Sequence, residues 1–209
     1  ILRSAPLTSL PGGEWRPDFS PEGDRIAFQW SGPDPDNPNH DIYVKQIGPG
    51  DPLRLTTYPG GDFCPYWSPD GREVAFARWL PDRIAVMTVP ALGGPERTLI
   101  EVGRNQKEDT GLTGISWTFD GTGLFVSFRP ADEERARVFL LSRETGELKA
   151  ITSPPEGTRG DYYAELSPDG EKIAFFRRES TLDWDLYVQA LADDEPTRLT
   201  FENFVTAVG

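Results

Sequence analysis

The chain is poor in the side chains on which most enzyme chemistry depends. It has one cysteine, Cys64, and one histidine, His40, among 209 residues. A single cysteine excludes an intramolecular disulfide and a zinc site built from two or four cysteines. A Ser-His-Asp arrangement would have to use His40, which we expect to be a solvated loop histidine, and the sequence has no GxSxG, GxGxxG or Walker pattern. We therefore expect no catalytic residue and no cofactor here, and the catalytic residues of any fused enzyme would lie outside this chain.

Long apolar runs and clusters of basic residues are also missing. No stretch approaches the roughly 20 apolar residues of a membrane helix, and no signal-peptide pattern is visible, so we expect no membrane insertion. The chain opens at Ile1 without a methionine, which is typical of a processed or excised piece, and localisation cannot be read from its start. The formal net charge is −13, with 34 acidic residues against 21 scattered basic ones. Nucleic acid is excluded as a partner because its phosphates would be repelled.

What the sequence has in abundance is one repeated phrase. It reads FSPEGDRIAF at 19–28, WSPDGREVAF at 67–76, WTFDGTGLFV at 117–126 and LSPDGEKIAF at 166–175. The copies follow one another at steps of about 50 residues, and every copy keeps its glycine. A type I turn followed by a left-handed residue joins two antiparallel strands, and only glycine takes a positive φ there without strain. The phrase is therefore predicted to be a hairpin turn, not a site.

Each repeat contains four runs that are typical of short strands. After the strand that follows the turn come DIYV, RIAV, RVFL or DLYV, and then LRLT, RTL, KAIT or TRLT. No convincing period of 3.6 residues is present. Tandem units of four strands predict an all-β fold, a β-propeller with about four complete blades that is part of a larger propeller. We expect blades at 9–56, 57–100, 101–152 and 153–200, with the closing strand of a blade at 1–8 and the start of a further blade at 201–209.

The pattern (W/F)SPDGxxIAF, followed by DIYV and then LT, resembles the TolB-like, WD-repeat-like propeller repeat over almost the whole chain. The resemblance implies a non-catalytic bacterial module for protein–protein or ligand interaction, fused within a larger protein of six or seven blades and located in the periplasm or otherwise outside the cytoplasm. The same phrase occurs in prolyl-oligopeptidase-like serine peptidases. The alternative is therefore the substrate-gating propeller of such a peptidase, without its hydrolase domain here. Open edges on the end blades would allow self-association.

The candidate site lies just before the turns, where the copies differ. Six residues upstream of the turn Ser or Thr stand Glu14, Asp62, Leu112 and Asp161. The site that we predict comprises three of these acids with the residues that follow them: Glu14, Trp15, Arg16, Asp62, Phe63, Asp161, Tyr162 and Tyr163. Because the innermost strand of a blade starts near the central channel, this ring of residues would bind a cationic or peptide ligand at the channel mouth. The alternative is structural, since each of the three acids follows a glycine and would cap backbone N–H groups.

Two further features have weaker functional interpretations. The loop 31–41 contains five Asp or Asn residues with hard oxygen ligands, but prolines interrupt it and the EF-hand register fails, so we expect turns there and no metal. Trp79 and Trp184 lie in or near loops and are candidate anchors for a partner.

Overall fold

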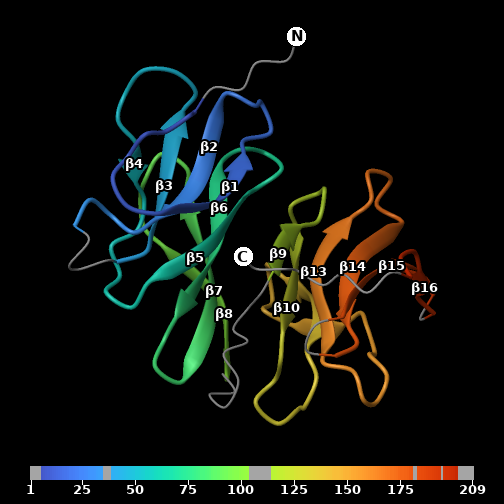
Figure 1. Ribbon diagram of the computed structural model, residues 1–209. Coiled ribbons are helices and arrows are strands. Elements are labelled where there is room, and N and C mark those ends of the chain that lie inside the picture. The colour runs from blue at the N-terminus through green and yellow to red at the C-terminus, as the bar shows by residue number, and fades with distance from the viewer. Residues whose placement is uncertain (1–5, 35–38, 104–113, 181–182, 194, 202–209) are drawn as a thin grey trace. The chain divides into compact units, whose positions relative to one another are not determined.

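The computed structural model describes residues 6–34, 39–103, 114–180, 183–193 and 195–201, and this part of the chain is all-β (Figure 1). It forms four antiparallel sheets, each with its four strands paired in chain order. The first two sheets are β1 (Glu14–Phe19), β2 (Arg25–Trp30), β3 (Asp41–Gln46), β4 (Leu53–Arg54), and β5 (Asp62–Trp67), β6 (Glu73–Trp79), β7 (Arg83–Pro90), β8 (Arg97–Gly103). The other two are β9 (Gly114–Trp117), β10 (Gly123–Phe128), β11 (Arg137–Ser142), β12 (Leu148–Ala150), and β13 (Gly160–Leu166), β14 (Lys172–Arg178), β15 (Trp184–Ala190), β16 (Thr197–Arg198). The four-stranded repeats confirm the predicted fold class.

By its internal contacts the chain divides into two compact units. Unit 1 comprises 1–81 and 85–98, and unit 2 comprises 82–84 and 99–209. Unit 1 holds the β1–β4 sheet and most of the β5–β8 sheet, and unit 2 holds the β9–β12 and β13–β16 sheets. Within the described ranges no helix could cross a membrane.

The repeated phrase forms the hairpin turn that its sequence predicts. The four turn glycines have φ values of 71°, 67°, 68° and 75°. Each donates its N–H to the carbonyl of the Ser or Thr that opens the turn, at 2.8–2.9 Å. In the second copy the Ser68 hydroxyl donates to Asp70 Oδ1 at 2.7 Å and accepts from the N–H of Glu73 at 3.0 Å. Ser68 and Asp70 are therefore engaged in holding the turn.

The strand after each turn supplies the core. In unit 1, Val74 and Phe76 are fully buried and pack with Trp67 and Ile42 in one apolar cluster between two sheets. In unit 2, Phe175 belongs to the corresponding cluster between the β9–β12 and β13–β16 sheets. Because one sheet cannot cover both of its faces, neighbouring repeats bury each other, as propeller blades do.

Some predictions fall on residues that the structure does not describe. The predicted closing strand at 1–8 is described only from residue 6 onwards, where no strand occurs, and the predicted start of a further blade is described only at Phe201. Leu112 also lies outside the described residues, as do positions 35–38 of the Asx-rich loop. The blade boundaries stay predictions.

Candidate functional site

Two of the three predicted acids lie in buried ion pairs. Asp62 and Asp161 are each 0% exposed. Asp62 stands opposite Arg78 across β5 and β6, and its two oxygens accept from Nε at 2.8 Å and Nη2 at 2.9 Å. Asp161 stands opposite Arg177 across β13 and β14, with the same two bonds at 2.7 and 2.9 Å. Both are bidentate ion pairs, in which two N–H groups of the planar guanidinium bind the two carboxylate oxygens.

The same acids also join successive sheets. The N–H of Asp62 donates to the carbonyl of His40 at 2.6 Å, and that of Asp161 donates to the carbonyl of Ala136 at 2.9 Å. Burial raises the pKa of both carboxyl groups, although their arginine partners and hydrogen bonds from Thr56 and Thr152 act in the opposite direction. These contacts are those expected of acids that hold the entry to a strand.

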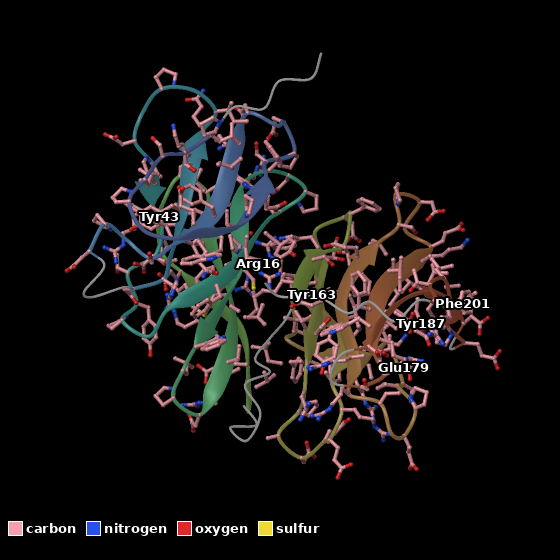
Figure 2. All side chains as sticks on the ribbon, in the orientation of Figure 1. Arg16, Tyr43, Tyr163, Glu179, Tyr187 and Phe201 are labelled. Atoms are coloured by element: carbon pink, nitrogen blue, oxygen red, sulfur yellow. The ribbon has the colours of Figure 1, made fainter. Side chains whose placement is uncertain are left out.

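The arginines are themselves held by further groups. Arg78 also binds Glu96 at 2.6 Å, and its guanidinium lies 4.5 Å from the ring centroid of Tyr58. The guanidinium of Arg177 lies 4.8 Å from the ring centroid of Tyr187, whose hydroxyl donates to Glu179 at 2.9 Å (Figure 2). Both pairs are therefore fixed by aromatic stacking as well as by charge.

Glu14 departs from this pattern. Its register partner on β2 is Trp30, whose indole N–H donates to the carbonyl of Pro11 at 2.8 Å. Glu14 Oε2 accepts from the hydroxyl of Thr8 at 2.9 Å, while Oε1 is buried and has no hydrogen-bond partner in the described part of the chain. The first repeat thus keeps the acid and the threonine but lacks the arginine.

The third predicted position has a strained backbone in three repeats. Arg16, Cys64 and Tyr163 are the non-glycine residues with positive φ among those described, at 53°, 54° and 54°. Each lies at a β-bulge, where the register between the first and second strand of its sheet shifts. A left-handed non-glycine residue costs on the order of 1–3 kcal/mol. The equivalent residue in the remaining sheet is Gly114, which lies in a regular ladder.

The side chains at the bulges differ in chemistry and exposure. Arg16 is exposed, Tyr163 is partly buried and Cys64 is buried, which raises the pKa of its thiol. In unit 2 the absence of a side chain at Gly114 is what admits the bulge, since a Cβ there would lie 3.0 Å from Tyr163 Cα. The hydroxyl of Ser116 then donates to the carbonyl of Ala164 at 2.7 Å.

Aromatic rings form a continuous strip in unit 1. The centroid distances are 5.2 Å from Trp15 to His40, 5.3 Å from His40 to Phe63 and 4.6 Å from Phe63 to Trp79. We call these four residues the aromatic strip. The ring of Trp15 occupies the space of a Cβ on Gly13, and that of Phe63 lies 3.0 Å from the Cβ position of Gly61. The glycine before each acid therefore makes room for the ring after it.

His40 corrects one expectation from the sequence. It is not a solvated loop histidine, because it is packed between the rings of Trp15 and Phe63 and partial burial lowers its pKa. Its Nδ1 lies 3.2 Å from Gln29 Nε2. Sequence reasoning missed this residue because the contact joins the start of β1 to the residue before β3.

In unit 2 the aromatic residues at the equivalent positions gather around Trp184. Tyr162 is buried, donates its hydroxyl to the carbonyl of Arg159 at 3.0 Å and lies 5.2 Å from the ring of Trp184. Tyr163 lies 6.3 Å from the same ring, and the guanidinium of Arg178 covers it at 5.1 Å. Figure 2 labels two of the bulge residues, Arg16 on β1, which is exposed, and Tyr163 on β13, which is partly exposed.

Comparisons with solved structures show the fold. The structure is similar to TolB from Acinetobacter baumannii, with a TM-score of 0.72 at 20% identity over 90% of this chain and 44% of that one. It is similar to a prolyl endopeptidase, with a TM-score of 0.66 at 15% identity over 91% of this chain and 30% of that one. The β-propeller domain of the Trilobed protease from Pyrococcus furiosus gives a TM-score of 0.56 at 15% identity, over 91% of this chain and 57% of that one.

This chain spans less than two thirds of each of these longer chains. No family model and no curated protein sequence matches it. The likenesses establish the β-propeller fold, and they leave the activity open because a propeller supports many unrelated functions.

Proposed function

We propose that this TolB-like β-propeller is a non-catalytic module that binds a peptide or protein partner through the bulged first strands of its blades. One observation carries the proposal: Arg16, Cys64 and Tyr163 share one position of the repeat and one strained conformation. Strained backbone persists only where the surrounding structure enforces it, and it gathers at functional sites.

At the bulge position the side chain varies between repeats while the left-handed backbone stays the same, and this variation supports a role in binding a partner. A turn that needed only its shape would have glycine at this position, as the four hairpin turns do. Instead the position carries a guanidinium, a thiol and a phenol, and the residue before it is Trp15, Phe63 or Tyr162. Aromatic and arginine side chains are those that dominate protein interfaces.

The ion pairs narrow the set of contact residues. Asp62 and Asp161 have their charges matched by Arg78 and Arg177 inside the protein, so they are poor candidates for a ligand's cation. The proposed contact residues are therefore the bulge residues Arg16 and Tyr163 and the ring of Trp15, of which Trp15 and Arg16 are exposed.

The test uses variants that separate binding from folding. Peptides are selected on the wild-type chain from a displayed random library, and their affinity is compared with that of the Arg16→Gly and Tyr163→Gly variants. Glycine removes the side chain and relieves the strain, so we expect melting temperatures equal to or above that of the wild type together with at least a tenfold loss of affinity. A variant that binds as tightly as the wild type would show that its residue does not contact the peptide. Failure to select any peptide would refute the proposal.

The second candidate is the substrate-gating propeller of a serine peptidase. Its support is the fold shared with a prolyl endopeptidase and with the Trilobed protease propeller. A hydrolase domain encoded beside this segment would favour it, and a regulator or another binding domain would favour the first candidate. Peptide hydrolysis by the 209 residues alone would contradict both.

Location outside the cytoplasm belongs to the same proposal and rests on the TolB-like repeat. Fractionation of cells that produce the native protein tests it, and recovery in the cytoplasm would contradict it. Self-association through blade edges is also proposed, and sedimentation of the chain at increasing concentration would reveal it.

A further inference from the structure

Arginine side chains cover at least three of the six tryptophan rings. The guanidinium of Arg25 lies 4.9 Å from the ring centroid of Trp67, that of Arg143 lies 5.6 Å from Trp117, and that of Arg178 lies 5.1 Å from Trp184. A guanidinium over an indole face is attracted by the negative face of the ring, and it keeps the face from contact with water. The same cation–π contact between a guanidinium and an indole face thus recurs in this protein.

Trp15 differs from these three residues. All six tryptophans are described, and Trp15 alone has an exposed side chain, at 45% of its surface. Its one ring neighbour is His40, which meets it at a tilt of 56°, and no described arginine or lysine lies over its face. The ring is nevertheless fixed in place, because it fills the space above Gly13, where no side chain competes with it.

The other three residues of the aromatic strip are uncharged near pH 7. Phe63 and Trp79 are apolar, and partial burial lowers the pKa of His40, so its imidazole is neutral near pH 7. The chain as a whole carries 34 acidic residues against 21 basic ones. Long-range attraction therefore favours a cationic partner, and the local surface offers it a rigid aromatic face.

We propose that Trp15, supported by His40 and Phe63, is a cation–π platform that receives an arginine side chain of the bound peptide. This inference rests on the proposed function and specifies the chemistry of its partner. The incoming guanidinium would take the place over Trp15 that Arg25, Arg143 and Arg178 take over the rings of Trp67, Trp117 and Trp184. Trp15 already has its orientation set by Gly13 and His40, so little side-chain freedom is lost on binding.

The experiment is a double-mutant cycle on the intact chain. Peptides are selected from a displayed random library, and each enriched arginine is replaced by citrulline, which keeps the shape and removes the charge. Affinities of both peptides are measured with the wild type, with Trp15→Ala and with Phe119→Ala. Phe119 is a matched control because it is an aromatic residue that is 55% exposed and lies outside the strip.

We expect enriched peptides to contain arginine, and citrulline to weaken binding to the wild type by about 2- to 30-fold. Trp15→Ala should lose a similar factor and should no longer distinguish arginine from citrulline, because the cycle isolates the coupling between the two groups. Phe119→Ala should behave as the wild type.

Four results would overturn the inference. Citrulline peptides that bind the wild type equally well would exclude the cation. Equal discrimination by Trp15→Ala would exclude Trp15 as the group that receives the cation. Enriched peptides that lack arginine would refute the platform while leaving the peptide-binding function in place. A selection that enriches no peptide would refute both.

Discussion

The buried pair of Asp161 and Arg177 allows a quantitative prediction. Asp161→Asn keeps the shape of the side chain but leaves a guanidinium that is 5% exposed without its counter-charge. Breaking a buried pair by removing one partner costs about 3–5 kcal/mol, because the remaining charge stays desolvated. For a chain of this size each kcal/mol shifts the melting temperature by about 2–4 °C, so we expect a fall of roughly 6–20 °C.

Two matched variants should lose less stability than Asp161→Asn. In Asp62→Asn the guanidinium of Arg78 retains Glu96 at 2.6 Å, so the loss should be smaller than in Asp161→Asn. Glu14→Gln should cost least, since Trp30 takes the position of the arginine opposite Glu14 and a glutamine oxygen can still accept from Thr8.

Thermal unfolding followed by circular dichroism measures all three variants. If Asp161→Asn melted within a degree or two of the wild type, the pair would not support the fold. Asp62 and Asp161 would then again be candidates for contact with a ligand.

Three further predictions concern strain and pH. Gly160→Ala should destabilise the protein far more than Gly157→Ala in thermal melts, because a Cβ at Gly160 would lie 2.3 Å from the carbonyl oxygen of Ala136, whereas the left-handed Gly157 has open space; equal losses would contradict this. The pKa of His40 is lowered in the fold, so its contribution to stability is present above pH 6.5 and is lost as the pH falls through the folded pKa. His40→Gln should flatten the change in melting temperature between pH 7 and 5, and an unchanged slope would be contrary evidence. The pKa of Asp120 is lowered by the hydroxyl of Thr118 and by Thr122, so its contribution is present above about pH 4 and is lost below. Asp120→Asn should reduce the loss of stability in acid, and a variant as acid-sensitive as the wild type would refute this.

The parts of the fold that depend on local chemistry were predictable. Pro69, Asp70 and Gly71 specify their turn within four residues, and the repetition of that turn indicates tandem four-stranded units. Phe76 lies in a continuous run of four apolar residues after the turn, which is typical of a strand that is buried on both faces. These features need no knowledge of how distant residues meet.

The contacts of the candidate site were not predictable in the same way. Asp62 and Asp161 meet arginines 16 residues later, and that distance depends on the turn and on the extra residue of a bulge. The same spacing in two repeats was a signal that could have been read. The left-handed conformation of Cys64 and Tyr163 leaves no trace in residue type, since both are ordinary strand residues.

The proposed binding surface can be located directly by NMR. A library-selected peptide is titrated into the isotopically labelled chain while backbone amide shifts are followed. The account predicts that the largest changes fall in the bulged first strands, at 14–16 and 62–64 in unit 1 or at 161–163 in unit 2, with the hairpin turn at 68–71 unaffected. Changes confined to the turns or to the β16 edge would contradict the claim that this propeller binds through the bulged first strands of its blades.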